Sequence, residues 1–179
     1  MGYLINAIES YINNGRIYVS LIVVLSVFVI DYMILHCKKD VHPQILFKYS
    51  FLAVYVYLIL EITVLSREVR DDYYFLPQLF WTYRMIGYGY VSLIYEAVWN
   101  IIMFIPMGIV LTTGKSRYIF IKIILEAFVF VIAVESLQLY LNRGIFETDD
   151  IFHALVGTSI GYLIVKAANR IRNKNTEVK

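Results

Sequence analysis

The chain has 179 residues, and 60% of them are apolar, against about 45 to 50% in soluble globular domains. A mean hydropathy of +0.66 points in the same direction. The formal net charge of +2 is too small to indicate a nucleic-acid partner, and the single cysteine excludes an internal disulfide and a multi-cysteine metal site. The sequence therefore predicts one integral membrane domain over residues 1–179, with no cofactor.

Five apolar runs are long enough to cross a bilayer core, which takes about 20 helical residues. In chain order they cover residues 17–36, 49–65, 90–111, 118–141 and 151–168. They lack the two-residue alternation of membrane β-strands, so we expect an all-α bundle of about five transmembrane helices. Before the first run, apolar residues at helical spacing predict an amphipathic helix over residues 1–11, lying on the outer surface.

The basic residues predict the orientation of the bundle. With five spans, the segments on the N-terminal side carry five Lys and Arg residues, whereas the other side carries eleven. Because the cytoplasmic side of a membrane protein holds the excess of Lys and Arg, the N-terminus should lie outside and the C-terminus in the cytoplasm. Segments 66–89 and 142–150 are then exterior.

Three acidic residues within the predicted spans should sit at a common depth. At about 1.5 Å per residue, each lies roughly 6 to 9 Å below the outer boundary. A charge in hydrocarbon is costly, so these carboxylates need partners, and we expect arginines of the exterior segments to neutralise Glu61 and Glu135. The carboxylates are Glu61, Glu96 and Glu135, and the arginines roofing the pocket are Arg67, Arg84 and Arg143.

Further polar residues share helix faces with these groups. Asn100 lies one turn after Glu96, Gln138 follows Glu135 at i+3, and Asp149 and Asp150 precede His153 at similar spacing. The pattern predicts a polar pocket open to the outside. The alternative is an ion-pair network that only holds the helices in register.

Other features have structural explanations. Glu126 lies on the opposite helix face from Glu135, and Lys122 at i,i−4 is its expected partner. Gly157 and Gly161 form a G-x-x-x-G pattern, which is typical of closely packed membrane helices. Pro106 should kink the third span.

Most of the chain resembles the VanZ-like family. The resemblance rests on a segment of the form N-x-x-x-F-x-P-x-G, an E-x-x-Q pair, an arginine, paired aspartates and a final helix with small residues. These are Asn100 to Gly108, Glu135 with Gln138, Arg143, Asp149 with Asp150, and Gly157 with Gly161. Thr63 to Arg67 and Pro77 match the earlier part of the family pattern loosely, and His153 stands where asparagine is more usual.

The resemblance implies a small bacterial multi-pass membrane protein, whose namesake lowers susceptibility to the glycopeptide antibiotic teicoplanin without remodelling the peptidoglycan stem peptide. The family pattern implies that the functional positions are Arg67, Asn100, Glu135, Gln138, Arg143, Asp149 and Asp150. We therefore expect a site that binds a membrane lipid, a lipid-linked cell-wall precursor or the lipoglycopeptide antibiotic. Guanidinium groups would meet its phosphates or carboxylates.

Two alternatives stay open at this stage. An intramembrane hydrolase or transferase could act on a lipid-linked phosphate headgroup, with Glu135 or His153 as general base and a divalent metal held by Asp149, Asp150 and His153. Against it, the paired aspartates are typical helix N-caps. Proton- or solute-coupled transport is less favoured, because the sequence shows no inverted repeat. A homo-oligomer, which would reopen the transport hypothesis, is left open.

Overall fold

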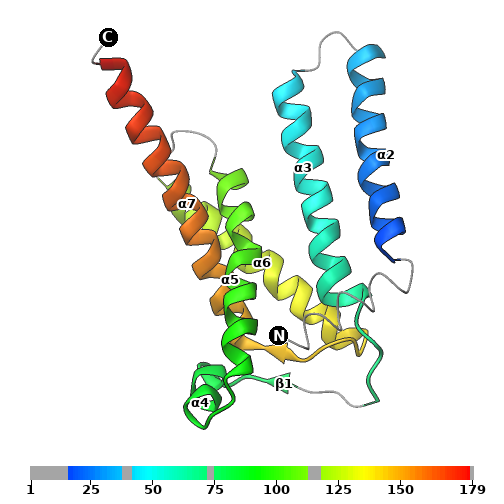
Figure 1. Cartoon of the computed structure of the whole chain (residues 1–179), viewed down its shortest axis with the longest axis vertical. Helices are drawn as coiled ribbons and strands as arrows, with labels where there is room; N and C mark the ends of the chain where they lie inside the picture. The colour runs from blue at the N-terminus through cyan, green and yellow to red at the C-terminus, as the bar shows by residue number, and fades with distance from the viewer. Residues whose placement is uncertain (1–15, 38–41, 72–74, 113–117, 178–179) are drawn as a thin grey trace. The chain divides into compact units, whose positions relative to one another are not determined.

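The computed structural model describes residues 16–37, 42–71, 75–112 and 118–177 of the chain (Figure 1). The predicted amphipathic helix over residues 1–11 lies outside these residues. Within them, helices dominate and strands are minimal, which confirms the all-α membrane fold. In chain order the elements are α2 (Arg16–Cys37), α3 (Pro43–Leu60), η1 (Glu61–Leu65), β1 (Phe75–Leu76), α4 (Trp81–Gly87), α5 (Ser92–Leu111), α6 (Ile119–Tyr140), β2 (Phe146–Glu147) and α7 (Thr148–Glu177).

Four helical segments in the described part of the chain are long and apolar enough to cross a membrane. They are Arg16–Cys37, Pro43–Leu65, Ser92–Leu111 and Thr148–Lys174. The predicted span 118–141 is also a helix, α6, but it contains three charged residues and is not one of these four. The chain is thus a membrane protein, whereas five passes and the orientation of the termini stay predictions.

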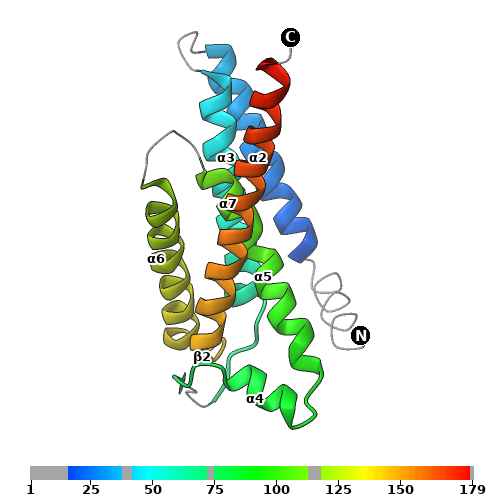
Figure 2. The same cartoon turned by 90° about the vertical axis from the view of Figure 1, so that its left-hand side faces the viewer.

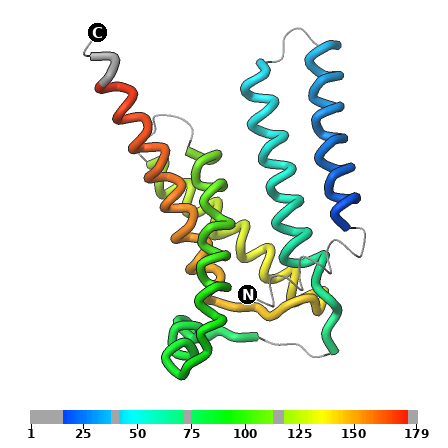
Figure 3. Tube along the Cα trace, in the orientation of Figure 1, coloured from blue at the N-terminus to red at the C-terminus, as the bar shows by residue number. Residues whose placement is uncertain are grey.

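The elements fall into two compact units, Met1–Glu68 and Val69–Lys179. In the first unit, α2 and α3 lie side by side as an antiparallel hairpin (Figure 3). Polar pairs join them at three levels. The Arg16 guanidinium contacts the Glu61 carboxylate at 3.1 Å, the Ser20 and Tyr57 hydroxyls lie 3.2 Å apart, and the Ser50 hydroxyl donates to Asp31 at 2.7 Å. A polar seam therefore fixes the register of two otherwise apolar helices.

The outer end of this hairpin, in the predicted orientation, is a π-helical turn. In η1 the backbone N–H of Ser66 donates to the carbonyl of Glu61, five residues earlier. Such a wide turn displaces carbonyl groups from the regular ladder. Arg16 donates to the Leu65 carbonyl at 2.6 Å as well as to Glu61. One guanidinium thus satisfies both a buried carboxylate and a carbonyl at the end of the helix.

In the second unit, α7 packs most extensively against α5, and glycines make this contact possible (Figure 2). A Cβ added at Gly157 would collide with the carbonyl of Ile101, and one at Gly161 with the carbonyl of Ile105. Gly108 of α5 faces the Thr158 carbonyl in the same way. The predicted packing role of the G-x-x-x-G pattern is confirmed, and it brings the two backbones into direct contact.

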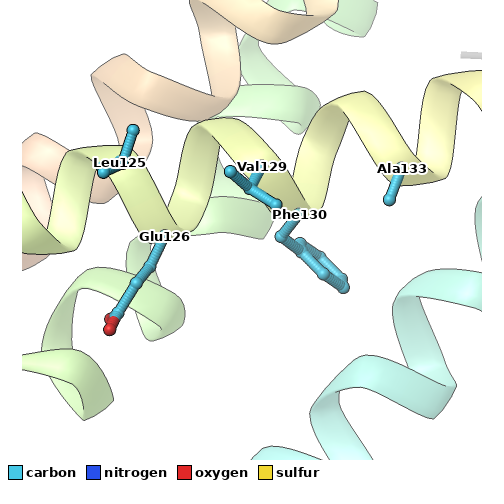
Figure 4. A pocket seen from close by; sticks show the side chains of 5 residues that line it. All are labelled: Leu125, Glu126, Val129, Phe130 and Ala133. Carbon is cyan, nitrogen blue, oxygen red and sulfur yellow. The ribbon is translucent and has the colours of Figure 1, made fainter.

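Helix α6 contacts α7 less extensively and presents an apolar side. The expected ion pair between Lys122 and Glu126 is confirmed, with 3.7 Å between the charged atoms. Figure 4 shows the side chains that line a pocket on this helix, the Glu126 side chain among them. Its lining is Leu125, Glu126, Val129, Phe130 and Ala133. This set shares no residue with the predicted ligand pocket.

Candidate functional site

The polar side chains of the second unit concentrate where β2 runs into α7. Each residue of this junction is tied to a different element. The Glu147 backbone N–H donates to Glu135 of α6 at 3.0 Å, and the Thr148 hydroxyl donates to the Leu76 carbonyl of β1 at 3.3 Å. Strand β2 pairs in parallel with β1, with Phe75 opposite Phe146. The start of α7 is therefore the point at which α6, β1, α4 and α5 are joined.

Asp149 anchors α4 at this junction. Its two carboxylate oxygens accept the backbone N–H groups of Phe80, at 2.5 Å, and Thr82, at 2.7 Å. Phe80 precedes α4 in the left-handed conformation, with φ of 63°. The side chain of Asp149 is buried and supplies the cap that the first turn of α4 needs. The capping role expected of the aspartates is thus present, but Asp149 caps α4 and not its own helix.

Asp150 connects α7 with α5. The Asn100 amide donates to Asp150 Oδ1 at 2.6 Å. The same oxygen lies 3.7 Å from His153 Nδ1, one turn further along α7. The structure therefore brings together three of the predicted residues, Asn100, Asp150 and His153, and Asp149 precedes Asp150 directly.

His153 links this cluster to α4. Its ring is only 1% exposed, and its Nε2 lies 3.0 Å from the hydroxyl of Tyr83. Nδ1 is buried and makes no hydrogen bond. Partial burial of Tyr83, and in second place the negative charge of Asp149, raise the pKa of the phenol above its ordinary value of 10.0. The phenol therefore keeps its proton to a higher pH than an ordinary tyrosine does.

A second group of predicted residues lies on α6. Glu135 and Gln138 are both 2% exposed. The Gln138 amide approaches Glu135 Oε1 at 3.5 Å, and the other carboxylate oxygen accepts the Glu147 N–H. Their side chains thus support the strand that leads into α7.

The end of α6 fixes the position of Arg143. The backbone N–H of Arg143 donates to the Gln138 carbonyl at 2.9 Å, and that of Asn142 donates to the Leu139 carbonyl at 3.2 Å. Asn142 is left-handed, with φ of 54°. This is the Schellman pattern, with asparagine where glycine is more common. Arg143 is thereby held three residues beyond Tyr140, the last residue of α6, and is half-buried.

The remaining predicted residues have varied surroundings. Arg84 is exposed on α4 and donates to the Gln78 side chain, and Glu96 is exposed on α5, one turn before Asn100. In the first unit, Glu61 is buried and paired with Arg16, whereas the sequence-based prediction named arginines of the exterior segments. Arg67 is exposed just after η1. A common pocket for the three glutamates and three arginines stays a prediction.

The metal alternative does not gain a suitable donor set. Within the described residues, no three His, Cys, Asp or Glu side chains are grouped so that they could hold a metal ion. Both oxygens of Asp149 already accept backbone N–H groups, and Asp150 accepts from Asn100. The set of Asp149, Asp150 and His153 is therefore arranged for structural hydrogen bonds.

Two residues of these networks are absent from the sequence-based prediction. Tyr83 lies 70 residues before His153, among sixteen tyrosines that otherwise resemble an interfacial belt. Arg16 lies at the start of the first span. Lys38 and Lys39 form the charged break between the first two apolar runs, and Arg16 lies about as far before this break as Glu61 lies after it. An antiparallel hairpin centred on that break would pair them, so this signal was available, whereas Tyr83 had none.

Comparisons with known proteins agree with the motifs on these helices. No curated protein and no solved structure matches the chain. The family model described as VanZ/LLP1 matches residues 17–169, which include every residue of the cluster at the start of α7 and most of each unit. The chain is therefore a member of the VanZ/LLP1 family.

Proposed function

We propose that this protein lowers the susceptibility of a bacterial cell to glycopeptide antibiotics such as teicoplanin, by binding a lipid-linked envelope component or the drug at the outer leaflet. Family membership supports the link to glycopeptides. One observation carries the binding site: Asn100, Asp149, Asp150 and His153 meet at the start of α7, within a strongly apolar chain. Polar groups in membrane helices are costly and usually mark functional sites.

In this proposal the N-terminus lies outside, the C-terminus is cytoplasmic, and the junction of α4, β2 and α7 faces the exterior. Arg143 and Arg84 meet phosphates or carboxylates of the ligand, because a guanidinium can donate two parallel hydrogen bonds to such groups. Glu135 and Gln138 hold the strand beside Arg143. Glu61 and Glu96 are the remaining predicted contributors to the pocket.

The Arg143→Ala variant tests the binding assignment. Purified protein in nanodiscs is titrated with a polyprenyl-phosphate-linked glycolipid and with teicoplanin, and lipids and metals that copurify are identified by mass spectrometry. We expect Arg143→Ala to weaken binding at least tenfold, since a charge-assisted contact contributes about 1.5 to 3 kcal/mol. Glu135→Gln should weaken it less. Lys174→Ala, at the far end of α7, is the matched loss of one positive charge. Equal binding by Arg143→Ala and Lys174→Ala would remove the arginine assignment.

The contact between His153 and Tyr83 favours a second candidate, an intramembrane enzyme acting on a lipid-linked phosphate headgroup. A histidine within hydrogen-bonding distance of a hydroxyl, with a carboxylate on the other side of the ring, is the arrangement of a general base and its orienting group. Cleavage of the same glycolipid at one phosphoester bond, seen as the paired appearance of a sugar phosphate and a polyprenyl product and lost in His153→Asn, would establish this activity. Binding without turnover would leave the non-catalytic function.

A further inference from the structure

The ring of His153 lies between an exposed tyrosine and the half-buried carboxylate of Asp150. Tyr83 is 43% exposed, whereas His153 is 1% exposed, and their rings meet edge to face with 5.7 Å between the centroids. On the far side, Nδ1 faces Asp150 Oδ1 at 3.7 Å without a hydrogen bond. Asn100 holds that oxygen in place. A partly exposed phenol is thus connected through one imidazole to an oriented carboxylate.

The position of the proton on the neutral His153 ring decides which way the contact between His153 and Tyr83 is polarised. If the proton is on Nδ1, it points toward Asp150 and leaves the lone pair of Nε2 for the Tyr83 hydroxyl proton. The reverse tautomer would set the Nδ1 lone pair against a carboxylate oxygen, which is electrostatically unfavourable. The Nδ1–H tautomer therefore fits the surroundings, and in it the Tyr83 hydroxyl donates inward.

We propose that Asp150, His153 and Tyr83 form a relay, electrostatic between Asp150 and His153 and hydrogen-bonded between His153 and Tyr83, in which the protonation state of His153 sets the polarity of a ligand-contacting hydroxyl on Tyr83. With neutral His153, the outward lone pairs of the Tyr83 oxygen accept a hydrogen bond from the ligand. With a second proton on the ring, Nε2 donates to Tyr83, and the hydroxyl proton turns outward. Toward the ligand, the Tyr83 hydroxyl thus changes from a hydrogen-bond acceptor to a donor without a movement of the backbone.

The charges around the relay define the ligand group. Asp149 and Asp150 of α7 are the charged neighbours, Asn100 of α5 is uncharged, Glu96 of α5 is exposed, and Glu135 of α6 binds the N–H of Glu147. The two carboxylates disfavour an anion at the Tyr83 hydroxyl itself and favour a neutral donor there, while the exposed Arg84, next to Tyr83 on α4, is the cation proposed for the phosphate of the ligand. We assign a sugar hydroxyl to this position. The assignment rests on the proposed function, because a lipid-linked precursor and a glycopeptide both carry sugars.

Nitrogen NMR of the protein labelled at histidine tests the relay itself. The chain has three histidines, and the His153 resonances are those missing from His153→Asn. In phosphatidylcholine nanodiscs at neutral pH, we expect Nδ1 to carry the proton and the Nε2 resonance to shift in Tyr83→Phe. Tyr88→Phe, which removes a hydroxyl from a residue that is 79% exposed at the end of α4, should leave it unchanged. A proton on Nε2, or an unchanged Nε2 resonance in folded Tyr83→Phe, would overturn the relay.

Carbon NMR of the Tyr83 ring tests the ligand class. Nanodiscs containing an uncharged galactosyl diacylglycerol supply a lipid-borne sugar, and methyl galactoside supplies a free one. We expect the Tyr83 resonance to respond to at least one of them at neutral pH, and the response to fall at least twofold once both His153 nitrogens are protonated. His153→Asn should abolish this pH dependence. No response to either sugar, or the same pH dependence in His153→Asn, would overturn the assignment, and neither result depends on phosphate binding by Arg143.

Discussion

The carboxylate of Asp149, at the start of α7, accepts the backbone N–H groups of Thr82 and Phe80, which lie 67 and 69 residues earlier in the chain. One side chain thereby caps a seven-residue helix that is too short to be stable alone. Phe80 also meets Phe152 edge to face, with 5.5 Å between the ring centroids. The position of α4, and with it the position of Tyr83, depends on the first turn of α7.

Replacing Asp149 should therefore release α4. In Asp149→Ala the two N–H groups lose their acceptor, and an unsatisfied buried donor costs about 1 to 3 kcal/mol. We expect a lower thermal unfolding temperature in detergent and faster amide exchange over residues 80–87. Asp71→Ala is the control, because it removes an exposed carboxylate from the segment between η1 and β1. Equal unfolding temperatures for the two variants would contradict the capping role.

The raised pKa of Tyr83 predicts a dependence of stability on alkaline pH. Because the folded-state pKa lies above the unfolded value of about 10, the folded protein holds its phenolic proton when the unfolded chain has lost it. The contribution of the protonated Tyr83 to the free energy of unfolding is complete below pH 10 and is lost as the pH rises through the folded-state pKa. The free energy of unfolding should then fall less steeply above pH 10 in Tyr83→Phe than in the wild type, as measured by denaturant titration.

A further variant separates the two causes that raise the pKa of Tyr83. Asp149→Asn removes the smaller, Coulombic cause and should lower the pKa of Tyr83 only part of the way toward 10, since burial of the phenol remains. Carbon NMR of the labelled tyrosine ring follows this titration directly. A pKa of Tyr83 that is the same in Asp149→Asn as in the wild type would show that the carboxylate does not contribute.

The helices could be predicted from the sequence because a run of about 20 apolar residues has few other solutions in a membrane. The predicted run 17–36 and the helix Arg16–Cys37 differ by one residue at each end. The short elements could not be predicted, because Phe75–Leu76 pairs with residues 71 positions later and α4 needs a cap from a distant aspartate. Such elements are defined by tertiary contacts and not by local pattern.

The site could be predicted in part for the same reason. Neighbours on one helix, such as Asp150 and His153, follow from helical spacing. Partners on different helices, such as Tyr83 for His153, depend on how helices cross, which spacing does not encode. Family motifs supplied Asn100 and Asp150 as separate positions, and the structure shows that they are hydrogen-bonded to each other.

The ion pair between Arg16 and Glu61 should contribute more to the free energy of unfolding than the ion pair between Lys122 and Glu126. Glu61 is almost completely buried, so Arg16→Ala leaves a buried carboxylate without this partner and also removes the donor to the Leu65 carbonyl. Loss of one member of a buried pair costs about 3 to 5 kcal/mol, and the partial exposure of Arg16 should reduce this figure. Lys122→Ala, from an exposed pair, should cost about 0.5 kcal/mol or less. Unfolding in mixed micelles compares them, and similar losses would contradict the difference in burial.

The glycines of the α5–α7 contact should tolerate no side chain. In Gly157→Ala and Gly161→Ala, the new methyl group would overlap a backbone carbonyl of α5, and a backbone atom cannot rotate away as a side chain can. Overpacking of a close contact costs about 1 to 3 kcal/mol, so both variants should unfold at lower temperature and lose part of the hydrogen bond between Asn100 and Asp150, which lies on the same helix pair. Gly87→Ala is the matched control, because a Cβ there meets nothing within 4 Å. Wild-type unfolding temperature in Gly161→Ala would mean that α5 and α7 lie further apart than the structure places them.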